Sequence, residues 1–126
     1  EKFYDQTNVF SSGENDTVIS NDFLFIKKKD ALKKVKLEDI IYIEVEERYC
    51  HIITEQEKFL ILISLTKLME QLDVKKFFQT HRNIVIQADK IVEIIPSQNL
   101  IILKGNHSVT LSDKYKGFIS QFQVIK

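Results

Sequence analysis

The 126-residue sequence has few of the residues that cross-link or break a chain: one cysteine, one proline, three glycines and no tryptophan. One cysteine excludes an internal disulfide, which suits a reducing compartment. Scarce glycine argues against a phosphate-cradling loop, and neither Walker nor dinucleotide-binding fingerprints occur. No apolar run approaches the roughly 20 residues that span a bilayer, and no leader pattern opens the chain. We therefore expect a cytoplasmic protein that does not associate with a membrane.

Residues that bind metals or act as nucleophiles are equally sparse. The candidates are Cys50, His51, His81 and His107, and no CxxC or HxxxH spacing joins them. Cys50 and His51 are adjacent, so in a strand they point to opposite faces. A Cys50–His81 pair would need an oxyanion hole and an orienting third residue, and the sequence indicates neither. We therefore expect no metal, no cofactor and no enzymatic activity.

Charge is balanced over the whole chain but not along it. Residues 1–22 carry one of the 18 basic side chains and five of the 18 acidic ones, so residues 23–126 carry 17 and 13, a net charge of +4. Residues 1–21 also lack hydrophobic periodicity and read as a linker. Because the chain begins with Glu1, we expect a fragment whose N-terminal neighbour is missing. The domain proper is expected over residues 22–126, and its mild basicity permits an anionic partner such as DNA.

Most of that domain has the alternation of short β-strands. The runs 40–46 and 49–54 predict a hairpin, and the nearly all-apolar run 58–63 predicts a strand buried on both faces. Gly105 and Asn106 suit a two-residue type II′ turn. The remaining predicted strands cover residues 23–27, 91–95, 100–104 and 107–111, together with the two apolar segments on either side of residues 80–83. The triple lysine 27–29 reads as a solvated hairpin tip.

Two helices complete the pattern. Ser64 is a fair N-cap for a helix whose Leu65, Leu68, Met69 and Leu72 share one stripe. In the same way, Ser112 precedes an amphipathic segment, residues 113–122, with four large apolar side chains at helical spacing. We therefore predict a mostly β protein, with antiparallel sheets in a sandwich or open-barrel arrangement, one short mid-chain helix and a short C-terminal helix.

The candidate site lies in three polar connections between predicted elements. The first is Thr80 to Asn83, within the segment 77–86, FFQTHRNIVI, where His81 and Arg82 lie between two apolar strands, although ordinary turn residues are the simpler interpretation. The other connections are residues 47–51 and 112–116. Arg, His, Asn and Lys are the side chains that reach phosphates and base edges. Three such loops at one sheet edge would form a surface able to enter a DNA groove.

The order of these segments, from Phe23 to about Phe122, resembles the LytTR family of bacterial DNA-binding domains. The resemblance covers about four fifths of the chain and is carried by the segments LEDIIYIEVEERYCHI (37–52), ISLTKLMEQL (63–72), FFQTHRNIVI (77–86) and SVTLSDKYKGF (108–118). It implies a mostly antiparallel β fold whose loops insert into successive major grooves. It also implies paired repeat sites, a possible dimer on DNA, and a preceding receiver domain with its cognate sensor kinase.

Carried over residue by residue, the resemblance implies a set of DNA-contacting positions. These are Arg48, Tyr49, Cys50, His51, His81, Arg82, Asn83, Lys114 and Lys116. Three positions depart from the family pattern: Gln79 where members often have Arg, Gln87 where they often have Asn, and Asp113 where they often have Arg. Asp113 is expected to occupy the first turn of the last helix, where a carboxylate favours the positive end of the helix.

The hypothesis is therefore sequence-specific binding of duplex DNA by the output domain of a transcriptional response regulator. Arg82 is the first choice for a base-edge contact. The alternative is a protein-interaction module that pairs with another chain through the exposed strand edge at Phe23 to Lys27.

Overall fold

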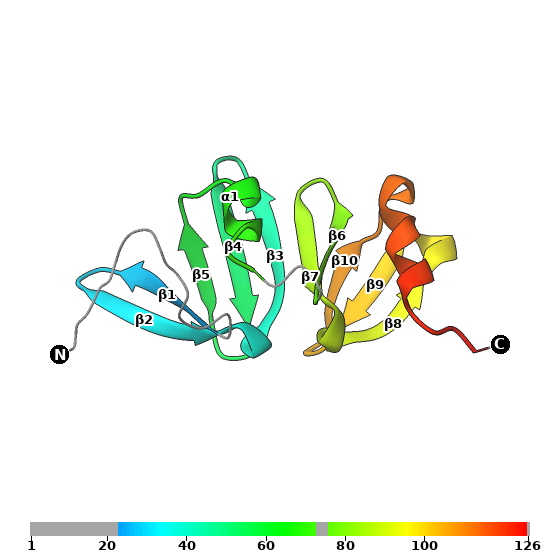
Figure 1. The fold of residues 1–126 in the computed structure, drawn as a ribbon, viewed down its shortest axis with the longest axis horizontal. Helices are drawn as coiled ribbons and strands as arrows, with labels where there is room; N and C mark the ends of the chain where they lie inside the picture. The colour runs from blue at the N-terminus through cyan, green and yellow to red at the C-terminus, as the bar shows by residue number, and fades with distance from the viewer. Residues whose placement is uncertain (1–22, 73–75, 126) are drawn as a thin grey trace.

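A five-stranded antiparallel sheet forms the centre of the structure (Figure 1). The computed structural model describes residues 23–72 and 76–125, and the segment 1–21 that we expect to be a linker lies outside them. The sheet has the order β5-β4-β3-β7-β6. Its strands are β3 (Ile40–Glu46), β4 (Tyr49–Thr54), β5 (Lys58–Ile61), β6 (Phe77–His81) and β7 (Ile84–Gln87). The predicted 40–46/49–54 hairpin is confirmed, with Glu46 opposite Tyr49.

Two smaller antiparallel sheets flank the central one (Figure 1). A ribbon pairs β1 (Phe23–Lys28) with β2 (Ala31–Lys36), so the three lysines lie at its tip as predicted. A three-stranded sheet has the order β10-β9-β8. Its strands are β8 (Ile91–Ile95), β9 (Leu100–Leu103) and β10 (His107–Thr110), and the helical elements are η2 (Leu37–Asp39), α1 (Leu65–Met69), η3 (Ala88–Lys90), η4 (Pro96–Gln98) and η5 (Asp113–Gln121). The predicted mostly β class is confirmed.

Strands β3, β4 and β7 of the central sheet are packed on both faces, and strand alternation divides their side chains between two cores. In β4, Ile52 enters one core and Ile53 the other; in β7, Val85 and Ile84 divide in the same way. The first core lies under the β1–β2 ribbon and α1, and includes Ile26, Val35, Leu68 and Leu72. The second lies under the three-stranded sheet and η5, and includes Ile101, Leu103, Val109 and Phe118.

The two helices dock as the sequence predicts. The Ser64 hydroxyl accepts a hydrogen bond from the Lys67 backbone N–H at 3.2 Å, and the α1 stripe packs on the first core. The C-terminal element is a 3₁₀ helix. Its Phe118 and the following residue, Phe122, both pack on Phe78 of β6, with ring centroids 5.5 and 5.4 Å away. This aromatic cluster fixes η5 against the edge of the central sheet.

Three local predictions are wrong. The run 58–63 is not buried on both faces: β5 is an edge strand, with Leu60 56% and Leu62 66% exposed. The hairpin between β9 and β10 is not a type II′ turn, because Gly105 and Asn106 both have positive φ, and three residues separate the paired Leu103 and His107. Ser112 does not cap η5 with its side chain.

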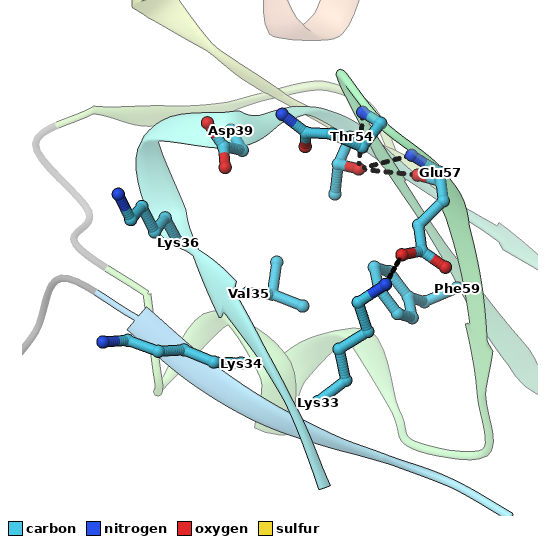
Figure 2. Close-up of a pocket in the computed structure, with 9 residues that line it drawn as sticks. Lys33, Lys34, Val35, Lys36, Asp39, Thr54, Glu57 and Phe59 are labelled. Atoms are coloured by element: carbon cyan, nitrogen blue, oxygen red, sulfur yellow. Dashed lines mark hydrogen bonds and ion pairs between the residues drawn. The ribbon is translucent and has the colours of Figure 1, made fainter. Parts of the chain in front are cut away.

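Two carboxylates in the β4–β5 turn fasten the smaller sheets to the central sheet. Glu57 forms ion pairs with Lys28 and Lys33 of the ribbon, and Figure 2 shows Lys33 reaching Glu57 beside the Phe59 ring. Glu55 pairs with Lys90 at 2.5 Å and with Lys104 at 3.0 Å. We call this turn, residues 55–57, the closed end of the sheet.

The buried side chain of Gln87 holds the other side of this end together. It is 1% exposed, and its amide nitrogen donates to the carbonyls of Leu37 at 2.9 Å and Ile40 at 2.6 Å. The amide therefore ties the end of β7 to the entry of β3. It also gives these carbonyl groups a hydrogen bond in place of those that they lose to water on burial.

We predict that Gln87→Met lowers the free energy of unfolding by about 1–3 kcal/mol, because Met keeps the length of the side chain but leaves both carbonyls without this donor. Urea unfolding of the variant and the wild type measures the difference. An unchanged midpoint would show that the amide contributes nothing to stability.

The ion pairs at the closed end predict a dependence of stability on pH. Hydrogen bonds from Lys90 and Lys104 lower the pKa of Glu55, and hydrogen bonds from Lys33 and Lys28 lower the pKa of Glu57. Because each pKa is lower in the folded state, this stabilisation is present above the ordinary value of 4.5 and is lost as pH falls below it. In thermal melts from pH 7 to pH 3, the loss should be smaller for Glu55→Gln/Glu57→Gln than for the matched Glu93→Gln control. Equal losses would contradict the assignment.

Candidate nucleic-acid interface

The β3–β4 and β6–β7 turns lie side by side because β3 and β7 are neighbours. Their ladder runs from Tyr42 opposite Ile86 to Glu44 opposite Ile84. One further backbone bond extends it into the turn, where the Val45 N–H donates to the Asn83 carbonyl at 2.8 Å. The two predicted loops therefore emerge together, at the opposite end of the sheet from the β4–β5 turn.

The third predicted loop reaches the same end through a second backbone bond. The Ser112 N–H donates to the Thr80 carbonyl at 2.8 Å, which places the start of η5 against the end of β6. Figure 1 shows all three segments along the upper edge of the molecule. We call residues 47–48, 81–83 and 112–116 the loop end of the sheet. The structure thus brings together the three connections that the sequence singles out.

The β3–β4 turn presents an arginine at its tip. Glu47 adopts a positive φ of 59°, and Arg48 follows it, exposed to solvent. Tyr49 is 38% exposed at the first position of β4. Arg48 and Tyr49 are therefore accessible at the loop end.

The next two predicted contact residues lie deeper. Cys50 is fully buried in the first core, and its thiol donates to the Ile63 carbonyl at 3.2 Å. Burial also raises the pKa of the thiol. His51 lies on the opposite face, as predicted, with Nε2 3.2 Å from the Glu46 carboxylate. The expectation that Cys50 touches a surface ligand is thus wrong: its side chain packs under the turn and supports it.

The β6–β7 turn consists of Arg82 and Asn83, since His81 pairs with Ile84. Arg82 is exposed, whereas His81 and Asn83 are half-buried. The Asn83 N–H donates to Nδ1 of His81 at 3.1 Å, and the Gln79 amide donates to the Arg82 carbonyl at 3.1 Å. The turn is therefore held by side chains as well as by the strand ladder.

At the start of η5, the predicted cations differ in their freedom. Lys116 is 2.7 Å from the Asp113 carboxylate and also donates to the Pro96 carbonyl at 3.0 Å. Lys114 is exposed, with its ammonium 5.9 Å from the centre of the Tyr115 ring. Asp113 occupies the first turn, as expected. Lys114 is thus the freer of the two lysines for an anionic ligand.

Electrostatics at the loop end follow from which charges are paired. Glu46 lies against His51, and Asp113 against Lys116. Arg48, Arg82 and Lys114 remain as exposed cations outside these contacts, and Glu46, Glu47 and Asp113 are exposed anions beside them. Among the described residues, no group of three or more His, Cys, Asp or Glu side chains is placed to hold a metal ion. Likewise, no helix in that part of the chain is long and apolar enough to cross a membrane.

Sequence reasoning missed the roles of two glutamines. It treated Gln79 and Gln87 as departures from a family pattern, but both amides bind backbone carbonyls. Their partners lie three and as many as 50 positions away in sequence. No periodicity or spacing would have identified these contacts.

The fold and the loop end together define a β module that presents three polar loops from one edge of a rigid sheet. Residues 30–122 match the family described as the LytTr DNA-binding domain. The chain belongs to this family, which confirms the resemblance read from its segments.

Relatives and solved structures agree with this assignment. The chain is 31% identical over 93 residues to the sensory transduction protein LytT of Enterococcus faecalis, covering 71% of this chain and 38% of that protein. It is 28% identical over 76 residues to the transcriptional regulatory protein YpdB of Escherichia coli, covering 60% of this chain and 31% of that protein. A solved LytTr DNA-binding domain from Bacillus cereus superposes with a TM-score of 0.70 at 18% identity, covering 79% of this chain and 94% of that one.

The Asp113–Lys116 pair generates a prediction about ligand binding. Asp113→Asn removes one negative charge from the loop end and breaks the ion pair of Lys116, so that only its bond to the Pro96 carbonyl competes with a phosphate. We expect tighter binding to duplex DNA, with the slope of log K against log salt steeper by about 0.9 for the additional phosphate contact. Fluorescence anisotropy at several salt concentrations measures both. A slope equal to that of the wild type would show that Lys116 stays bound within the protein.

Proposed function

We propose that this domain binds duplex DNA sequence-specifically through the loop end, as the output domain of a transcriptional response regulator. One observation carries the proposal: two backbone hydrogen bonds gather three loops, and exposed Arg48, Arg82 and Lys114 lie one on each. Membership of a DNA-binding domain family supports DNA as the binding partner. It also favours DNA over the strand-edge pairing that the sequence left open.

Each cation has a role that its chemistry suits. Arg82 is at the tip of the middle turn, and a guanidinium donates to the O6 and N7 acceptors of guanine in the major groove. Arg48 and Lys114 are placed on either side of it, where they contact phosphates and set the register of the domain on the duplex. His51 and His81, half-buried at the strand ends, and Asn83, half-buried within its turn, support the loops.

The wider setting is also a proposal. The chain spans about a third of the length of the relatives it matches, which are named as sensory transduction and transcriptional regulatory proteins. In this proposal, a receiver domain precedes residue 1, a sensor kinase phosphorylates that receiver in the cytoplasm, and two copies occupy repeated half-sites on DNA. Half-sites one helical turn apart, about 10 base pairs, would present both sites on the same side of the duplex.

Binding, rather than catalysis, is the activity proposed. The one cysteine is buried, with its thiol bonded to a carbonyl and its pKa raised by burial, so little reactive thiolate forms at neutral pH.

We predict that Arg82→Ala weakens binding by about 1–3 kcal/mol and relaxes sequence preference, whereas Lys114→Ala weakens all sequences alike and lowers the salt slope by about one. The measurement is anisotropy with a duplex selected by the wild-type domain from a random pool, and with a scrambled duplex of equal length.

The matched control is Lys58→Ala, because Lys58 is an exposed lysine at the start of β5, next to the closed end. It should change neither the affinity nor the salt slope. If Arg82→Ala, folded as judged by its thermal melt, binds the selected duplex as tightly as the wild type, Arg82 does not read the sequence.

A further inference from the structure

The side chains of Gln79 and His81 bind the two polar groups of one peptide unit. The unit joins Arg82 to Asn83. Its carbonyl oxygen accepts the Gln79 amide at 3.1 Å, and its N–H donates to Nδ1 of His81 at 3.1 Å. A two-residue turn leaves such groups outside the strand ladder. Here two side chains of the preceding strand satisfy both.

The backbone of β6 makes this arrangement possible. The pairing with β7 shifts between Gln79 and His81, so Thr80 is the extra residue of a β-bulge. Thr80 is fully buried, while Gln79 and His81 on either side of it are partly exposed. Both flanking side chains reach the turn that follows, as their hydrogen bonds to it show.

Fixing this peptide unit restricts the direction in which Arg82 points. The orientation of the peptide plane after Arg82 depends on the ψ angle of that residue. On the far side of the unit, the Asn83 carbonyl is fixed by the Val45 N–H at 2.8 Å. An arginine on a turn held in this way loses less conformational freedom on binding than one on a free loop.

We propose that Gln79 is a positioning residue for sequence recognition: its amide holds the Arg82–Asn83 peptide so that Arg82 meets a base edge in one orientation. The inference rests on the proposed function. The neutral Gln79 side chain then contributes by positioning Arg82, whereas a basic residue at this position would contribute positive charge. Gln79 acts through Arg82 and does not itself touch DNA.

A double-mutant cycle separates positioning from direct contact. The four proteins are the wild type, Gln79→Met, Arg82→Ala and the double variant, each titrated with the selected duplex and with duplexes that carry single base changes. Met keeps the length of glutamine and removes its donors. We expect Gln79→Met alone to weaken binding to the selected duplex by about five- to tenfold, the value of one hydrogen bond, and to reduce discrimination between duplexes. In the Arg82→Ala background the same change should have no effect.

Gln56→Met, on the exposed turn at the closed end, is the control for the chemical change and should leave binding unaltered. A second measurement needs no DNA: ¹⁵N relaxation should show greater mobility at the Arg82 and Asn83 amides in Gln79→Met, with the rest of the domain unchanged.

The possible results have distinct meanings. Equal losses from Gln79→Met in both backgrounds, or no loss in either, would overturn the positioning role while leaving the reading by Arg82 intact. No loss on Arg82→Ala would instead overturn the proposed reading itself.

Discussion

Two backbone hydrogen bonds are the constraint on which the loop end depends. The bond from Val45 to Asn83 joins the first and second loops, and the bond from Ser112 to Thr80 joins the second and third. Residues more than 60 positions apart in sequence meet at one edge for this reason. Buried backbone groups must be paired, so these contacts belong to the fold and are present before any ligand arrives.

The central sheet places opposite chemistry at its two ends. At the closed end, Glu55 and Glu57 each pair with two lysines, which fastens both smaller sheets. At the loop end, Arg48, Arg82 and Lys114 remain exposed. Between the ends, two cores cover both faces of the sheet, so the loops stand on a support with little freedom to deform.

The sequence predicted what depends on local pattern. Alternation in 40–46 and 49–54 predicted the central hairpin, and the stripe around Leu68 predicted α1 and the face it buries. It failed where the neighbours of a segment decide its environment. The apolar run 58–63 gives no sign that β5 is an edge strand, and the positive φ of Asn106 follows from a three-residue loop that composition does not specify.

The same distinction holds for the site. Polar residue types at strand ends identified the three loops, because such side chains between apolar strands are expected at the surface. Three further features depend on three-dimensional proximity, which the sequence does not show. Cys50 lies beneath its loop, Asp113 forms an ion pair with Lys116, and the Gln79 amide donates to the Arg82 carbonyl. Residue types therefore indicated which loops to consider as a binding surface, and the contacts show which of their side chains are free to meet a ligand.

The most direct test of the account is an NMR titration of the ¹⁵N-labelled domain with a duplex that it has selected from random DNA. The account predicts amide shift changes concentrated at residues 47–51, 81–83 and 112–116, together at one edge of the sheet. The β4–β5 turn and the β1–β2 ribbon should be unaffected. Changes centred on the ribbon lysines, or at one of the three loops without the others, would contradict it.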